Sequence, residues 1–185
     1  HLNSVDQKLY ELFPEYNNIA YWNDQKAGMS LKNVLTMSAG YRWDEWSYTY
    51  TDTRNDANKL IRSDDLMKFV LDLPIAYEPG SQFTYNSGCS MLLSGIIKNS
   101  TGMSLEAFAR QNLFEKLGIE EWNWEQGKDG KFNSGWGLHL KPRDMLKIGK
   151  MVRDGGLWEG QRIVSEEWLK ESQTNHISSY GYQWW

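Results

Sequence analysis

Apolar residues recur along this chain in short runs at helical spacing, and serine, aspartate, glycine or proline stands at the ends of most runs. The richest run lies between Cys89 and Lys98 and is followed by Gly102, which predicts a buried helix closed by a glycine. Pro142 fits the first position of another helix, which continues to Val152. The same signals predict five more helices: near 9–12 after a Ser4–Gln7 capping box, at 31–35 after Ser30, at 66–71 after Ser63–Asp65, at 105–113 after Ser104, and at 166–169 after Ser165.

Strand patterns are few and short: they cover 83–85, 122–124, 137–140 and the aromatic segment from Tyr180 to Trp185. Strands of this length cannot form a sheet core by themselves. The sequence therefore predicts a mainly α fold with a few short strands. We interpret it as the helical part of a larger α/β (α+β) structure, in which 180–185 starts a sheet strand.

Composition and charge argue against several classes of partner and site. The 185 residues carry a net charge of −4 without a basic cluster, which argues against a nucleic-acid partner. No apolar run approaches the roughly 20 residues that cross a bilayer. Cys89 is the one cysteine, so neither an internal disulfide nor a cysteine zinc site can form, and its apolar neighbours predict that it is buried. The 10 tryptophans indicate either dense packing or a binding surface.

Several common catalytic signatures are missing. The chain has no glycine-rich phosphate loop, no dinucleotide fingerprint and no zinc-binding helix motif, and its histidines, His1, His139 and His176, are scattered. We therefore expect no metal and no cofactor. Ser38, in Thr36–Gly40, superficially resembles a nucleophile elbow, but the first glycine is missing, so we expect a capping or packing role for this serine.

The most informative stretch is 78–97. A Pro79–Gly80 turn leads through a short extended segment to Tyr85, Asn86 and Ser87, directly before the predicted apolar helix. Backbone amides at such a helix start can face a cleft, and a rigid helix would hold the phenol in place.

This stretch resembles the serine β-lactamase, DD-peptidase (penicillin-binding protein) and esterase superfamily, in its class C-like branch. Four more segments are similar to that family in the same order: Ser30–Gly40, Ser134–Met145, Gly155–Ser165 and Tyr180–Trp185. Each motif alone is only weakly specific for the family, but the motifs occur in the family's order and together span essentially the whole chain.

The resemblance implies acyl transfer through a serine ester, with Tyr85 as the proton shuttle. It places Ser87 at the third motif position, where asparagine is common, and Asn86 between them as a substrate-binding residue. The substitution leaves the hydrogen-bond donor at that position open, because a hydroxyl offers one donor where a carboxamide offers two. A phenol also needs an adjacent cation to act as a base at neutral pH.

Two family motifs do not occur in the chain: no serine is followed three positions later by lysine, and no Lys/His-Ser/Thr-Gly triplet is present. We therefore expect residues 1–185 to be a single unit, the excised helical domain of a longer hydrolase, inactive without its α/β domain. The substrate would be a β-lactam, a D-amino-acid peptide or an ester, and the family resemblance favours an extracytoplasmic or membrane-anchored parent.

Other interpretations remain open. Tyr85 could be a buried tyrosine bonded to the backbone, and Asn86 a simple turn residue. The chain could instead be a sensor, or a binding module with a row of exposed rings drawn from Trp43, Trp46, Trp122, Trp124 and Trp136. If apolar rings are exposed on the surface that the missing α/β domain would cover, the chain would self-associate.

Overall fold

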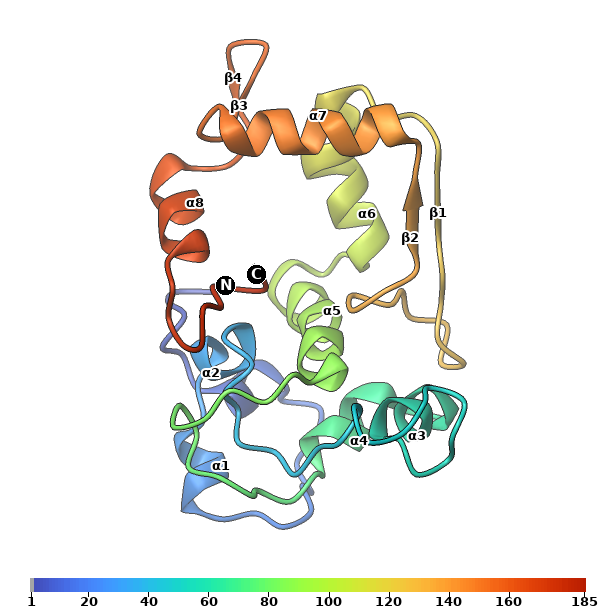
Figure 1. Ribbon diagram of the computed structural model, residues 1–185, viewed down its shortest axis with the longest axis vertical. Helices are drawn as coiled ribbons and strands as arrows, with labels where there is room; N and C mark the ends of the chain where they lie inside the picture. Colours follow the sequence, from blue (N-terminus) through green and yellow to red (C-terminus); the bar gives the residue numbers. More distant parts are fainter. Residues whose placement is uncertain (1) are drawn as a thin grey trace.

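The central element is the helix α5 (Ser87–Thr101), which packs against η1, α2, α3, α4 and α6 (Figure 1). This computed structural model describes residues 2–185. The remaining helices are η1 (Leu9–Leu12), α1 (Asp24–Gly28), α2 (Leu31–Leu35), α3 (Asp56–Arg62), α4 (Leu66–Leu71), α6 (Leu105–Ala109), η2 (Arg110–Phe114), η3 (Glu115–Leu117), α7 (Pro142–Arg153) and α8 (Glu166–Gln173). The strands are β1 (Trp122–Trp124), β2 (Leu138–Leu140), β3 (Leu157–Trp158) and β4 (Gln161–Arg162). The predicted fold class, mainly α with a few short strands, is confirmed.

Helix caps account for most of the correct predictions. Ser30 and Asn33 form a capping box at α2, and Ser104 and Ser165 accept backbone N–H bonds at the starts of α6 and α8. Gly102 ends α5 with a φ of 76°, a left-handed conformation that suits glycine. α6 runs on through η2 and η3, so the helical segment extends past the predicted end at 113.

Other helix predictions need correction. Ser4 does not cap a helix: its hydroxyl accepts from the N–H of Asp6, and the turn η1 starts later, after Lys8. α1 and α3 were not predicted, although Asn23 and Asn55 cap them. They are too short to show an apolar period, so only the cap residue marks them.

The strands also differ in part from the prediction. β1 and β2 pair antiparallel, with Trp122 opposite Leu140, as their alternation predicts. β3 and β4 form a second hairpin that was not predicted. The segment 83–85 forms no strand. Within 180–185, Tyr180 forms an isolated bridge to Ile177 and Gln183 has a φ of 61°. The strand predicted at 83–85 is wrong, because an alternating pattern makes a strand only where a partner lies beside it. That 180–185 starts a strand of a larger sheet stays a prediction.

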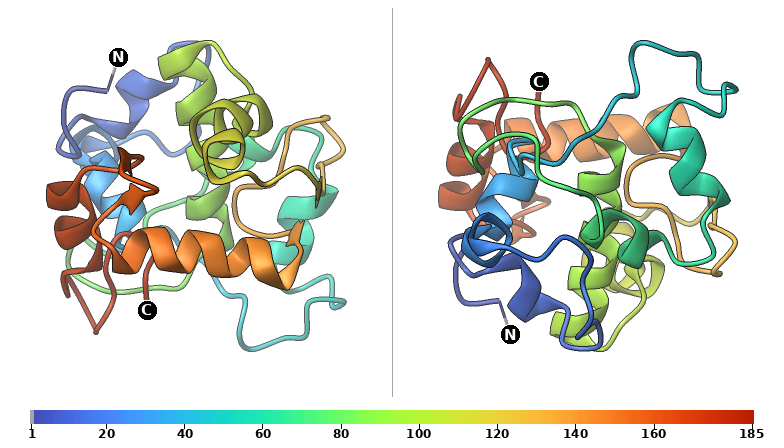
Figure 2. Two further views of the ribbon diagram at one scale, coloured as in Figure 1. Left: turned by 90° about the horizontal axis from the view of Figure 1, so that it is seen from above. Right: turned by 90° about the horizontal axis from the view of Figure 1, so that it is seen from below.

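Residues 2–185 form two hydrophobic cores. The larger one surrounds α5 and contains the buried side chains of α2 and α4, and the smaller one lies between α7 and the turns η2 and η3. Cys89 is buried in the larger core, as predicted. Figure 2 shows the loop 41–55 projecting at one edge of the molecule.

No helix within residues 2–185 is long and apolar enough to cross a membrane.

Candidate active site

Tyr85 lies directly before α5 and is half-buried. A hydrogen bond fixes the backbone just before it: the N–H of Thr84 donates to the carbonyl oxygen of Met37, just after α2, at 2.8 Å. The ring meets Trp46 edge-on, with centroids 5.6 Å apart, and stacks on Trp185 at 5.9 Å. These contacts fix the direction of the phenol while leaving it partly open to solvent.

Gly40 makes this placement possible. A Cβ at Gly40 would collide with the carbonyl of Tyr77, so the chain after α2 can lie this close to the Pro79 turn only with glycine. Its φ of 78° is also one that other residues rarely adopt. Ser38 is buried beside it and shares a 2.7 Å hydrogen bond with Thr36, which agrees with a packing role.

Asn86 is buried and serves as the N-cap of α5. Its Oδ1 accepts from the N–H of Cys89 at 3.1 Å. The structure thus gives this side chain a structural task at the helix start, and its predicted contact with substrate stays a prediction.

Ser87 is held by a residue that the sequence analysis missed. Glu45 accepts from both the N–H and the hydroxyl of Ser87, each at 2.8 Å. Its carboxylate is only 2% exposed and also accepts from Trp43 Nε1 at 2.6 Å and from the Tyr50 hydroxyl at 3.1 Å. Four donors and the positive end of a 15-residue helix therefore surround this one carboxylate.

The charge environment of Tyr85 favours the neutral phenol. Burial, followed by the charge of Glu45, raises the pKa of Tyr85, while the Ser87 hydroxyl opposes the shift. Burial and Glu45 likewise raise the pKa of Tyr50 to about 12. The cation that a catalytic phenolate would need is not supplied here by residues 2–185.

A pocket of about 370 Å³ opens beside these groups, between α3 and the start of α5. Its walls are the rings of Tyr50, Tyr85 and Trp136, the aliphatic side chains of Ala57 and Ile61, Gly135, and the polar side chains of Ser87 and Asn58. The structure thus brings two of the three predicted residues to one pocket and turns the third into the helix cap.

The tryptophans do not form the row of rings that a flat binding platform would need. Trp46 is 72% exposed, but Trp43 is buried and Trp136 packs partly against the larger core. Trp122 and Trp124 pack against the smaller core. This exposure pattern counts against the platform and indicates packing for most of these rings.

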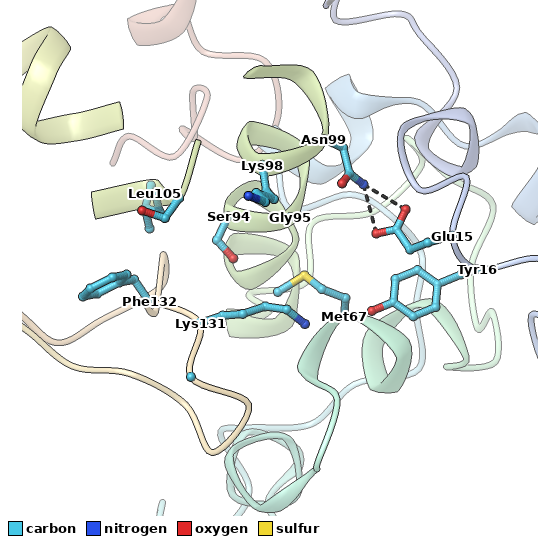
Figure 3. Close-up of a pocket in the computed structure, with 12 residues that line it drawn as sticks. Glu15, Tyr16, Met67, Ser94, Gly95, Lys98, Asn99, Leu105, Lys131 and Phe132 are labelled. Atoms are coloured by element: carbon cyan, nitrogen blue, oxygen red, sulfur yellow. Dashed lines mark hydrogen bonds between the residues drawn. The ribbon is translucent and has the colours of Figure 1, made fainter. Parts of the chain in front are cut away.

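A second pocket, of about 220 Å³, lies along the C-terminal half of α5 (Figure 3). Its polar rim is largely paired: Asn99 Nδ2 donates to both carboxylate oxygens of Glu15 at 3.0 Å, as the dashed lines show. Tyr16 donates to Asp65 at 2.8 Å. Because these groups satisfy one another, the Tyr85 pocket is the better candidate for chemistry.

Within residues 2–185, no three His, Cys, Asp or Glu side chains gather as a metal site would require. His1 lies outside the described residues.

Comparison with known proteins identifies the family and the fold. Over residues 4–183 the sequence matches the protein family described as Beta-lactamase. A 6-aminohexanoate-dimer hydrolase of Paenarthrobacter ureafaciens is 26% identical over 120 residues, which cover 56% of this chain and 31% of that protein.

Solved structures show the same fold. A Bacillus anthracis protein assigned as a 6-aminohexanoate-dimer hydrolase superposes with a TM-score of 0.78 at 18% identity, over 98% of this chain and 52% of that one. The octameric penicillin-binding protein homologue of Pyrococcus abyssi gives 0.72 at 19% identity, over 98% and 47%. The chain therefore spans about half the length of these structures, and about a third of the curated relative.

Proposed function

Because this chain belongs to the beta-lactamase family, we propose that it forms the tyrosine-bearing part of a serine hydrolase, with Tyr85 as the proton shuttle of acyl transfer. Relatives in this family are hydrolases, in agreement with the resemblance found in the sequence. The mainly helical structure corresponds to the helical portion of their fold.

The observation that carries the proposal is the position of Tyr85. A partly open phenol stands at the start of the central helix, between two rings that hold it, on the wall of a pocket. Such a phenol can take the proton of an attacking serine hydroxyl and return it to the leaving group, while the serine oxygen forms an ester with the substrate acyl group. Water then cleaves the ester and the hydroxyl is restored.

The raised pKa of Tyr85 sets a condition on this mechanism. Beside Glu45 alone the phenol is suited to donate a proton, and it can accept one only if a cation offsets that charge. The lysine of a Ser-x-x-Lys motif would supply this cation. No such motif occurs in these 185 residues, so we propose that the chain by itself does not form an acyl-enzyme.

The candidate substrates are β-lactams, D-amino-acid peptides and esters, to which the curated relative adds the amide of a 6-aminohexanoate dimer. All contain an acyl group that a serine can accept. The test is mass spectrometry of the chain, and of a polypeptide extended to the length of its relatives, after incubation with one compound of each kind.

We expect an added acyl mass on the extended polypeptide only. A stable acyl adduct on the 185-residue chain would contradict the predicted inactivity of this part. Failure of the extended polypeptide to react with, or turn over, any of the four compounds would contradict the hydrolase function itself.

A further inference from the structure

Glu45 joins the loop 41–55 to the central helix. Its carboxylate accepts from the N–H and from the hydroxyl of Ser87, and among residues 2–185 these are the only two hydrogen bonds between the loop and α5. The loop otherwise projects at the edge of the molecule (Figure 2). The hydrogen bonding of the loop to the helix therefore depends on one buried side chain.

The two oxygens of this carboxylate receive different kinds of donor. Oε2 accepts from the backbone N–H of Ser87 at 2.8 Å and from the indole N–H of Trp43 at 2.6 Å, and both groups can only donate. Oε1 accepts from the hydroxyls of Ser87 at 2.8 Å and Tyr50 at 3.1 Å, and a hydroxyl can also accept. A glutamine can therefore replace Glu45 with its oxygen at the Oε2 position and its nitrogen at the Oε1 position. All four contacts are then kept, while the charge is lost.

The same loop carries a ring that contacts Tyr85. Trp46 follows Glu45 directly and meets the ring of Tyr85 edge-on, with centroids 5.6 Å apart. The N–H groups of Trp46 and Ser47 donate to Asp44 Oδ1 at 3.1 and 3.0 Å, so the backbone on both sides of Glu45 is held in one turn. A carboxylate fixed at the start of α5 therefore also fixes Trp46 beside the phenol.

Glu45 acts on Tyr85 through its charge as well. Burial, followed by the charge of Glu45, raises the pKa of Tyr85. The other titratable groups near these two are Tyr50 on the loop, Tyr180 and Cys89. Burial raises the pKa of both tyrosines to about 12 and the pKa of Cys89 above its usual value, so all three are neutral at pH 7. Among the described residues, Glu45 is thus the charged group that acts on this phenol.

We propose that Glu45 is a positioning residue of this site: it fixes the loop 41–55 on the first turn of α5, holds Trp46 against Tyr85, and favours the protonated form of the phenol. That form gives its proton to the leaving group as the bond between this group and the acyl carbon breaks. The role of Glu45 in turnover rests on the proposed hydrolase function, whereas its effects on Trp46 and Tyr85 do not.

The test separates the charge of Glu45 from its reach. Glu45→Gln keeps the length of the side chain and removes the charge, whereas Glu45→Asp keeps the charge on a side chain one methylene shorter. In the 185-residue chain, NMR follows the titration of Tyr85 through its Cζ signal and the contact of the two rings through nuclear Overhauser effects between Trp46 and Tyr85. Glu167→Gln, an exposed change on α8, is the matched control.

The two variants should change different signals. In Glu45→Gln we expect Tyr85 to titrate at a lower pH than in the wild type, because the negative charge is gone, while the ring contact persists. In Glu45→Asp we expect most of the ring contact to be lost, because the shorter side chain cannot reach Ser87 and the donors of its own loop together. Tyr85 should still titrate at a higher pH there than in Glu45→Gln. Glu167→Gln should leave both signals unchanged.

A kinetic comparison in a polypeptide extended to the length of the relatives tests the role in turnover. Glu45→Asp should lower kcat by about tenfold to a hundredfold through misplacement of the phenol, with KM within about twofold of the wild-type value. In Glu45→Gln the alkaline limb of the pH profile of kcat should move to lower pH, because the acid form of Tyr85 is lost earlier.

A wild-type titration of Tyr85 in folded Glu45→Gln would overturn the proposal, as would a complete ring contact in folded Glu45→Asp. If circular dichroism shows that Glu45→Gln is unfolded, the predicted fit of glutamine is wrong and the proposal falls with it. If Glu45→Asp is unfolded, Ser87→Ala takes its place, because it removes the hydroxyl that bonds to the loop. The NMR outcomes do not depend on hydrolysis, so failure here is distinguishable from failure of the proposed function.

Discussion

At the scale of single residues, the site is organised around a contact that the sequence alone does not reveal. Tyr85, Asn86 and Ser87 were identified through the resemblance of the stretch 78–97 to the serine β-lactamase superfamily, and their roles stay predictions. Glu45 could not be identified in this way, because 42 positions separate it from Ser87, and only the folded loop brings its carboxylate to the helix start. The position of Glu45 between Trp43 and Trp46 was the one feature of the sequence that could have pointed to its role.

Lys26 is a second residue with an unusual environment, and it provides a test by pH. It is fully buried, and its ammonium donates to Ala20 O at 2.6 Å and Leu71 O at 2.7 Å. Burial lowers its pKa to about 8, although the charge of Asp72 partly offsets the shift. The folded state therefore binds this proton more weakly than the unfolded state does, whose lysine titrates near 10.5.

Stability should consequently rise as pH increases through 8 toward 10.5, since the buried charge is then removed. Between pH 7 and 9 we expect the wild type to gain about 1 kcal/mol relative to Lys26→Met, measured by urea denaturation. The comparison with the variant cancels the titration of Cys89 and the tyrosines, which is common to both proteins. If the free energies of unfolding of the wild type and of Lys26→Met change equally between pH 7 and 9, Lys26 does not titrate as described.

At the scale of elements, capping residues in the sequence correctly predicted where several helices begin. Helices begun by Ser30, Ser104 and Ser165 appear where predicted, because a cap acts within one turn. The segment 83–85 does not form the predicted strand, because pairing depends on a distant partner, about which an alternating pattern carries no information.

The packing of α5 can be tested with a pair of glycines. A Cβ at Gly95 would lie 2.6 Å from Phe13 Cε1 and 2.9 Å from Met67 Sδ, whereas one at Gly149 in α7 meets nothing within 4 Å. Gly95→Ala should destabilise the protein by about 1–3 kcal/mol through overpacking. Gly149→Ala should stabilise it by about 0.5–1 kcal/mol, because alanine is the better helix former.

Urea denaturation of both variants checks this pair. Stabilisation by Gly95→Ala of the same size as by Gly149→Ala would mean that α5 does not pack against η1 and α4 as closely as described.

At the scale of the whole molecule, the chain combines two cores with a face that carries the site. Trp185 is 74% exposed and Trp46 72%, and the ring of Tyr85 contacts both. The predicted family and fold class are confirmed, and the family match spans residues 4–183. Self-association through exposed rings stays a prediction, as do the substrate and the catalytic roles, since these depend on what surrounds this face.

The central claim is that Tyr85 transfers the proton, and Tyr85→Phe tests it in a polypeptide extended to the length of the relatives. The change removes the hydroxyl and keeps the ring between Trp46 and Trp185, so the unfolding midpoint should be unchanged. Tyr77→Phe, which alters an exposed tyrosine, is the matched control.

The measurement is kcat/KM with the substrate that the extended polypeptide turns over. The account predicts a fall of about 10²–10⁴-fold for Tyr85→Phe and a value within about twofold of wild type for Tyr77→Phe. Turnover by a folded Tyr85→Phe variant that matches the wild type would contradict it.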